Sequence, residues 1–347
     1  MRISLPRLFA AAAAWTVVMT ASLATRAEEP KKDLPKTIGS IESLDPAFAK
    51  LVPSTSTIEV LGGGFDWSEG PVWNKADKYL LFSDIPPNRI MKWKEGEGVT
   101  LFKEKIGYSG KEPFTGEEPG TNGLVYDSEG RLTMCCHGDR CIKRIEKDGS
   151  ITVLADKYDG KRLNSPNDLV FHSSGDIYFT DPPYGLPKRE NDPAKELDWF
   201  GVYRLSKDGK VTLLTKEMTR PNGIGFSSDE KTLYVAQSDP AAAIWKSFPV
   251  KQDGTLGESK LLFDATAWFK EGRPGLPDGL AVDSQGHIWA TGPGGVYCFT
   301  PDGKVLGRIN TGEKTANCKF GGDGSVLYIT ADMYIVRVRT SVKGLGF

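Results

Sequence analysis

A short sequence pattern recurs six times between residues 68 and 320, and it limits the possible folds more than any other feature of the chain. Each copy places a small residue or a proline before an acidic or amide residue, which is often followed by glycine and then by an apolar run. The copies begin about 39 to 56 residues apart, a spacing typical of propeller blades. They are Ser68–Trp73, Thr121–Tyr126, Pro166–Phe171, Pro221–Phe226, Pro277–Val282 and Ala316–Phe320.

Each copy is followed by further β-like runs. A polar turn leads into a second run, and a third run such as Gly201–Leu205 is often followed by an Asp-Gly turn and a fourth run. Asp-Gly between apolar runs is a strong hairpin signal. The pattern predicts an all-β fold, a six-bladed β-propeller of four-stranded blades. An unclosed pair of β-sandwiches is the alternative, but it would not need six copies in register.

The last copy lacks a fourth strand, because the chain ends soon after Tyr334–Val338. An unassigned β-like run, Thr57–Leu61, lies at the other end of the repeats. Placing this run as the outer strand of the last blade closes the ring and covers an open sheet edge. The propeller is therefore predicted to span residues 56–347 and to be closed by its N-terminal strand.

The N-terminus differs in composition from the repeats. Arg2 and Arg7 precede an apolar, alanine-rich run, and small residues allow cleavage after Ala27 or Ala24. Residues 1–27 are therefore predicted to be a signal peptide, with an uncleaved membrane anchor as the alternative. The protein is expected to be exported, either periplasmic or secreted, with no membrane span after cleavage. Residues 28–55 are weakly patterned and are predicted to form a leader or linker.

Composition excludes several function classes. The formal net charge of −1 argues against a nucleic-acid partner, which usually requires a basic surface. Three histidines make a His-rich zinc site improbable, and five cysteines in a chain of 347 residues do not form a disulfide scaffold. The sequence does not indicate an oligomeric state.

The acidic or amide position of the repeat carries the main functional signal. Equivalent positions on the inner strands of a propeller form a ring at one end of the molecule, and all six occupants carry a side-chain oxygen. Carboxylate and amide oxygens suit Ca²⁺ or Mg²⁺, and two carboxylates would balance one divalent charge. The six positions are Glu69, Asn122, Asn167, Asn222, Asp278 and Asn317.

A purely structural role is the alternative for this ring. Asn-Gly and Asp-Gly are common turn formers whose side chains bond to the local backbone. This interpretation is favoured for Asn122 and Asn317. It explains Glu69 poorly, because glutamate is not a turn former.

The sequence resembles the SMP-30/gluconolactonase/luciferin-regenerating-enzyme family, and within it the bacterial gluconolactonase branch. The resemblance extends from about residue 58 to 340. One departure is Arg140-Cys141, where that branch usually has two adjacent arginines. The motifs that carry the resemblance are Ser68–Trp73, Arg162–Asp168, Tyr178–Leu186, Pro221–Gly223, Pro277–Gly279 and Cys136–Gly138.

The resemblance implies a six-bladed propeller that holds one divalent cation and hydrolyses sugar lactones or related esters. Ca²⁺ is the favoured cation, with Mg²⁺, Mn²⁺ and Zn²⁺ as alternatives. Matched by motif, Glu69, Asn222 and Asp278 correspond to family cation ligands, and Asp278 to the general base. Asn167 corresponds to an asparagine that contacts the cation or the substrate.

Lactone hydrolysis requires a polarised carbonyl, an activated water and a stabilised oxyanion. A divalent cation can supply the first and third, and Asp278 can act as general base or as nucleophile. Asn167, Asn122, Arg162 and His137 are predicted to bind a small-molecule lactone or ester. For His137, a structural role in a hairpin is an equal alternative. No Gly-x-Ser-x-Gly or His-Glu-x-x-His motif occurs.

Two other functions remain open at this stage. The chain could be a non-catalytic binding propeller that keeps calcium only for stability, since propellers host many functions. It could also catalyse another reaction at the same cation, such as ester or phosphotriester hydrolysis.

Two long connections and the five cysteines give further predictions about the lid and about disulfide bonds. The segments Phe102–Thr121 and Tyr184–Trp199 are long connections next to ring positions, so they are predicted to form a lid. Cys141 could bridge to Cys135 or Cys136, and Cys298 could bridge to Cys318, if the compartment is oxidising. Free buried thiols are the alternative.

Overall fold

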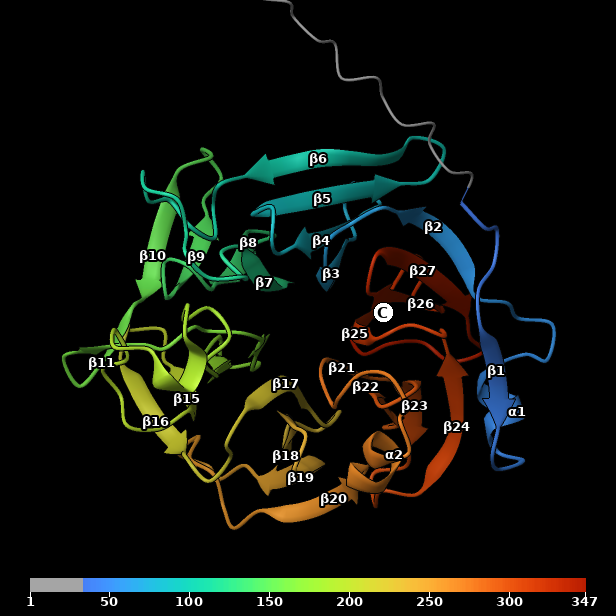
Figure 1. The fold of residues 1–347 in the computed structure, drawn as a ribbon. Coiled ribbons are helices and arrows are strands. Elements are labelled where there is room, and N and C mark those ends of the chain that lie inside the picture. The colour runs from blue at the N-terminus through green and yellow to red at the C-terminus, as the bar shows by residue number, and fades with distance from the viewer. Residues whose placement is uncertain (1–33) are drawn as a thin grey trace, which may run out of the picture. The chain divides into compact units, whose positions relative to one another are not determined.

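The computed structural model describes residues 34–347, and the predicted signal peptide, residues 1–27, lies outside them. Leu34–Phe347 form one compact unit. Six antiparallel sheets stand around a common axis, as Figure 1 shows, so the predicted six-bladed β-propeller is confirmed. The inner strands of neighbouring blades contact one another around the whole ring. No helix within this part of the chain is long and apolar enough to cross a lipid bilayer.

Each blade is an antiparallel meander, and in all but the last blade the four strands run in chain order from the axis outward. The first three blades are β3 (Ser68–Asn74), β4 (Tyr79–Asp84), β5 (Arg89–Lys94) and β6 (Gly98–Glu104); β7 (Thr121–Tyr126), β8 (Leu132–Cys136), β9 (Cys141–Ile145) and β10 (Ile151–Ala155); and β13 (Leu169–Phe171), β14 (Ile177–Asp181), β15 (Gly201–Leu205) and β16 (Val211–Thr215). A small hairpin, β11 (Lys157–Tyr158) and β12 (Lys161–Arg162), separates the second blade from the third.

The other three blades complete the circle. They are β17 (Pro221–Phe226), β18 (Thr232–Asp239), β19 (Ala242–Pro249) and β20 (Lys260–Asp264); β21 (Leu280–Val282), β22 (Ile288–Gly292), β23 (Gly295–Phe299) and β24 (Val305–Asn310); and β25 (Thr315–Gly321), β26 (Val326–Ala331) and β27 (Tyr334–Arg339). The last blade takes its outer strand from the other end of the chain: β2 (Glu59–Gly63) pairs with β27, with Val60 opposite Val336. The predicted closure by the N-terminal strand is therefore confirmed.

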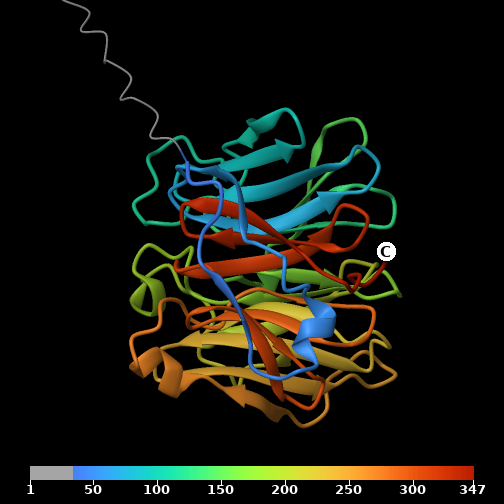
Figure 2. The same ribbon diagram turned by 90° about the vertical axis from the view of Figure 1, so that its right-hand side faces the viewer.

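The segment before β2 packs on the propeller. β1 (Ser40–Ser43) pairs with β24 and adds a fifth strand to that blade. The α1 turn (Phe48–Leu51) follows, and Figure 2 shows both elements, in blue, against the outside of the orange-red blade. Phe48 is buried, with its ring centroid 6.1 Å from that of Trp289. The part of the predicted leader that is described thus belongs to the folded unit, which begins before residue 56.

Replacing Phe48 with alanine tests whether this segment is part of the core. The substitution removes a buried aromatic ring, so Phe48→Ala should lower the free energy of unfolding by about 3–5 kcal/mol. Leu44→Ala, at a residue that is 58% exposed in the same segment, should change it by no more than about 0.5 kcal/mol. Denaturant unfolding followed by fluorescence measures both values. Equal effects of the two substitutions would mean that the segment does not pack against the propeller in solution.

All five cysteines lie within the described residues and are buried free thiols. Cys136 and Cys141 face each other across the β8–β9 hairpin and share one apolar cluster. Cys135 points to the opposite side of the sheet, into the cluster around Phe179. Of the two bridges considered for Cys141, the structure therefore rules out the one to Cys135.

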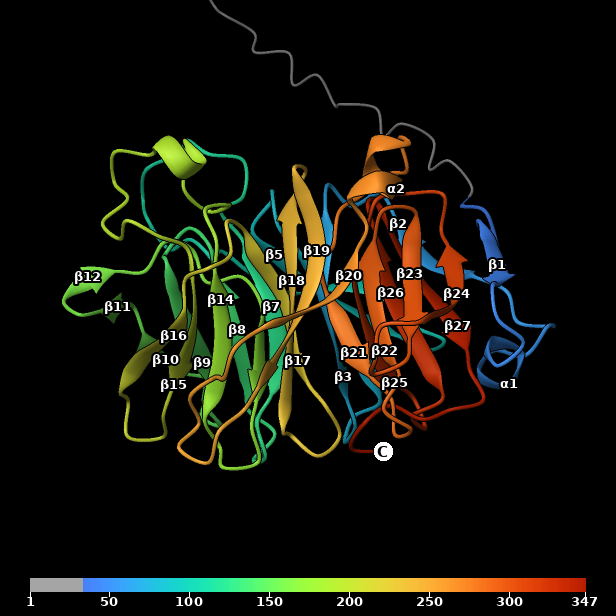
Figure 3. The ribbon, with the colours of Figure 1, turned by 90° about the horizontal axis from the view of Figure 1, so that it is seen from below.

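The loops that follow β6 and β14 lie at the same end of the propeller as α2 (Thr266–Lys270), as Figure 3 shows for the second loop and the helix. The second loop contains a short 3₁₀ turn, η1 (Arg189–Asn191). An ion pair of 2.9 Å between Arg189 and Glu117 connects the two loops.

Candidate active site

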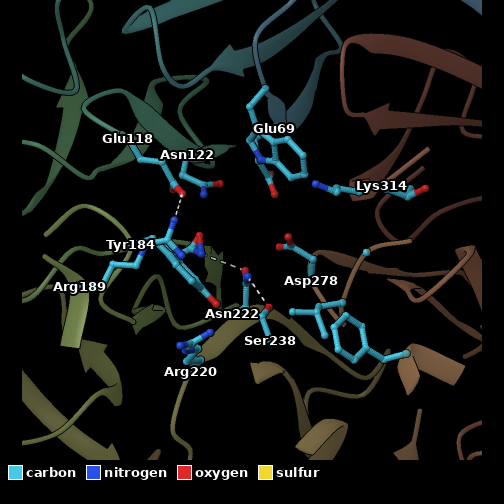
Figure 4. A pocket seen from close by; sticks show the side chains of 16 residues that line it. Glu69, Glu118, Asn122, Tyr184, Arg189, Arg220, Asn222, Ser238, Asp278 and Lys314 are labelled. Atoms are coloured by element: carbon cyan, nitrogen blue, oxygen red, sulfur yellow. Dashed lines mark hydrogen bonds and ion pairs between the residues drawn. The ribbon is translucent and has the colours of Figure 1, made fainter. Parts of the chain in front are cut away.

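A cavity of about 380 Å³ opens at the end of the propeller that carries α2. Ring positions from several blades form its floor, and the two loops with α2 contribute to its walls (Figure 4). The lining residues are Trp67, Glu69, Glu118, Asn122, Asn167, Tyr184, Arg189, Arg220, Asn222, Ser238, Phe269, Gly275, Leu276, Asp278, Lys314 and Thr315.

The glycine of the repeat lets neighbouring blades approach closely at this floor. A Cβ on Gly70, where φ is +52°, would lie 2.0 Å from the carbonyl oxygen of Asn122. A Cβ on Gly223 would lie 2.0 Å from the carbonyl oxygen of Asp278. At these positions the Gly after each acid or amide makes room for the ring residue of the next blade. The turn-forming interpretation of the pattern is therefore incomplete.

Two carboxylates face each other across the floor. Glu69 lies near the start of β3 and is 1% exposed, while Asp278 precedes β21 and is partly buried. Figure 4 shows their side chains directed into the same space. Asn317 Nδ2 donates to Glu69 Oε2 at 3.1 Å, so Asn317 holds this carboxylate and does not line the cavity itself.

The electrostatics of this pair favour a bound positive charge. Burial, with a smaller contribution from Asp168, raises the pKa of Glu69 to about 7. Desolvation and the neighbouring Glu69 raise the pKa of Asp278 well above its usual value. Both shifts reflect the cost of placing negative charges together away from water. A divalent cation between the two carboxylates would offset that cost.

The amide groups form a chain along the floor. Asn167 Nδ2 donates to Asn222 Oδ1 at 2.9 Å, and Asn222 Nδ2 donates to Ser238 Oγ at 2.8 Å. Asn222 Oδ1 keeps a second lone pair. Ser238 in turn donates to the carbonyl oxygen of Pro277, next to Asp278.

Three oxygens around the floor have no hydrogen-bond partner. They are Asn122 Oδ1, Asn167 Oδ1 and Asp278 Oδ1, and each is shielded from solvent with no donor among residues 34–347. Buried polar atoms are rarely left unpaired, and those without a protein partner are usually completed by a ligand, an ion or an ordered water. These oxygens, with Glu69, are the hard donors that Ca²⁺ or Mg²⁺ prefers. The residues present therefore fit a divalent cation.

The donor set differs from that of zinc or other transition-metal sites. In the described part of the chain, no three or more His, Cys, Asp or Glu side chains are grouped so that they could hold a metal. The oxygens available to a cation at this floor are those of the two carboxylates and the neighbouring amides, and water or substrate oxygens can complete its coordination.

Of the four residues predicted to bind substrate, two line the cavity and two do not. Asn122 and Asn167 line the cavity. His137 is fully buried behind its wall, with Nδ1 3.3 Å from Oε2 of the lining residue Glu118. Arg162 lies on β12, outside the cavity, and its guanidinium donates to the carbonyl oxygen of Asp139. Arg162 therefore does not line this cavity, because the β11–β12 hairpin carries it away from the ring.

Several residues that line the cavity were not predicted from the sequence as site residues. Tyr184 lies in a motif quoted for the family resemblance, and Glu118 lies in a loop predicted as a lid, so each had an indirect signal. Ser238 and Lys314 had none, because only the closure of the ring brings them to the cavity.

Fold and cavity together define a class of protein: a six-bladed β-propeller with an oxygen-rich site at one end of its axis. The sequence model of the SMP-30/Gluconolactonase/LRE-like region matches residues 67–332, and the chain belongs to this family. The resemblance inferred from its motifs is therefore confirmed.

Individual relatives agree with this assignment. The chain is 40% identical over 334 residues to a gluconolactonase of Zymomonas mobilis, covering 94% of this chain and 93% of that protein. The solved structure of a gluconolactonase from Xanthomonas campestris is 32% identical, with a TM-score of 0.76, and the match covers 90% of this chain and 99% of that one. The calcium-binding protein regucalcin from Agrobacterium tumefaciens shares the fold, at 22% identity and a TM-score of 0.65, over 82% of this chain and 94% of that one.

Proposed function

We propose that this protein is a lactone hydrolase that opens a sugar lactone such as gluconolactone, with a divalent cation at the floor of its cavity. The observation that carries the proposal is the pair of facing carboxylates, Glu69 and Asp278, surrounded by unpartnered amide oxygens in a cavity large enough for a small ligand. The gluconolactonases among the relatives support the choice of reaction.

In this mechanism Glu69, Asn167, Asn222 and Asp278 would hold the cation. When bound, it would polarise the lactone carbonyl, stabilise the oxyanion and keep the nearby carboxylates ionised. Asp278 takes a proton from water as the new C–O bond forms at the carbonyl carbon. It returns this proton to the ring oxygen as the ring C–O bond breaks. Asn122 and Asn167 orient the substrate from the floor.

The remaining assignments are proposed from the sequence and from relatives. Calcium is the proposed cation, because the donor set is all oxygen and a relative of this fold is described as calcium-binding. Export to the periplasm or the medium is proposed from the signal-peptide pattern of residues 1–27.

A substrate panel tests the reaction class. Purified protein with Ca²⁺ should open D-glucono-δ-lactone well above the spontaneous rate, measured by acid release with a pH indicator. Rates with an aryl ester and a phosphotriester should be lower, because the amide and carboxylate groups of the floor suit a hydroxylated ring. A blank without protein corrects for spontaneous opening. Binding of calcium with no acceleration of any substrate would instead support a non-catalytic propeller.

A further inference from the structure

Asp181, the last residue of β14, and the turn Pro182–Leu186 that follows it are held by several hydrogen bonds. The Asp181 carboxylate accepts from the backbone N–H groups of Asn164, at 2.8 Å, and Ser165, at 2.7 Å. Ser165 Oγ donates to the carbonyl oxygen of Pro182 at 2.6 Å and accepts from the N–H of Gly185 at 2.9 Å. The turn is thus tied to the segment that leads into Asn167 on the cavity floor.

The turn also has little freedom to move. Pro182 and Pro183 restrict the backbone before Tyr184. A Cβ on Gly185 would lie 2.6 Å from the Cβ of His137, so the backbone there packs directly against the β8–β9 hairpin. The result is a rigid support for Tyr184, whose side chain Figure 4 shows among the cavity residues. The guanidinium of Arg189 lies 6.0 Å from the centre of the Tyr184 ring.

The hydroxyl of Tyr184 has no hydrogen-bond partner in the described part of the chain, although it is shielded from solvent. The nearby Ser238 hydroxyl is already engaged, since it donates to Pro277 and accepts from Asn222. Burial raises the pKa of Tyr184, so the phenol keeps its proton and can donate. A rigidly held, unpaired hydroxyl at a cavity wall is costly unless a ligand completes it.

We propose that Tyr184 is a specificity residue whose hydroxyl forms a hydrogen bond with a hydroxyl group of the substrate. The site then selects hydroxylated lactones over lactones that lack hydroxyl groups, because a bare lactone leaves Tyr184 unpaired. A site built to bond a substrate hydroxyl discriminates strongly against the analogue without it. This inference rests on the proposed lactone hydrolysis, but its test includes a binding measurement that does not need catalysis.

The kinetic test compares D-glucono-δ-lactone with δ-valerolactone, which has the same ring size and no hydroxyl groups. Tyr184→Phe should lower the ratio of their kcat/KM values by about 10-fold to 100-fold. The same variant should melt at no lower temperature than the wild type, because it removes an unpaired hydroxyl. An unchanged ratio, or equal losses with both lactones, would overturn the proposal.

Tyr178→Phe is the matched control. Its hydroxyl is also in a buried environment, but it donates to the carbonyl oxygen of Gly254 at 2.8 Å, away from the cavity. This variant should melt at a lower temperature and keep the wild-type substrate ratio. A similar loss of selectivity in both variants would mean that the loss does not come from a contact of the Tyr184 hydroxyl with the substrate, and would overturn the proposal.

Calorimetry with D-gluconolactam separates failure of this inference from failure of the proposed reaction. The lactam keeps the hydroxyl groups but resists hydrolysis, and 2-piperidone is its counterpart without them. The wild type should bind the lactam more tightly than 2-piperidone, and Tyr184→Phe should lose most of that preference. If neither lactone is hydrolysed, this result still supports the hydroxyl contact. Absence of lactam binding, or an unchanged preference in the variant, would refute it.

Discussion

Asp278→Asn should lower kcat for gluconolactone opening by about 10²-fold to 10⁴-fold, the range expected for loss of a general base. Asparagine keeps the size of the side chain and an amide oxygen at the floor, but it cannot accept a proton from water. The variant should fold normally, because it removes one of two facing carboxylates. Steady-state kinetics with saturating Ca²⁺, together with a melting curve of the metal-free protein, measure both effects.

Asp302→Asn is a suitable control for this experiment. Asp302 is an exposed turn residue whose carboxylate accepts from Thr300 Oγ1 at 2.5 Å, and it lies outside the cavity. Its replacement should leave kcat unchanged. If Asp278→Asn retained more than about half of the wild-type rate, Asp278 could be neither base nor nucleophile, and the proposed mechanism would fail.

Removal of divalent cations should abolish hydrolysis and lower the melting temperature. A ligand at 100 times its Kd stabilises the folded state by about 2.7 kcal/mol, which corresponds to about 4 °C for a folded unit of this size. Dialysis against EDTA followed by Ca²⁺ titration measures both changes. The recovery of the hydrolysis rate and of the melting temperature with Ca²⁺, Mg²⁺, Mn²⁺ and Zn²⁺ then shows which cation the site prefers.

Glu69→Gln identifies the site responsible for this stabilisation. The variant should lose most of the shift in melting temperature on Ca²⁺ addition, because one of the two carboxylates that balance the ion is gone. Glu258→Gln, at an exposed residue outside the cavity, should respond to Ca²⁺ as the wild type does. If EDTA changed neither the melting temperature nor the rate of hydrolysis of the wild-type protein, the proposal of a bound cation would be contradicted.

The sequence predicted the ring well because its six copies are in register. Each acid or amide lies at or just before the start of an inner strand, and blade geometry brings such positions together whatever their separation in the chain. Glu69, Asn167, Asn222 and Asp278 accordingly line one cavity. Asn317 belongs to the same ring, but its side chain turns to support Glu69.

Features outside the repeat were harder to predict. β1 has only four residues, and Phe48 and Leu51 give too short an apolar pattern to indicate a packed segment. Arg162 is close in sequence to Asn167, yet two residues of strand in a small hairpin are enough to direct it elsewhere. Proximity along the chain is thus a weak guide to residues carried by loops.

The tight contact between blades at Gly70 and Gly223 has a consequence for engineering the cavity. Each of these glycines touches the backbone of a ring residue that belongs to the next blade, so the position of each ring residue depends on the blade before it. Bulk added at one glycine would displace an oxygen donor in the neighbouring blade, although its own side chain never enters the cavity. Grafting a single blade from a relative would therefore disturb two sites at once, and productive chimaeras should exchange adjacent blades as pairs.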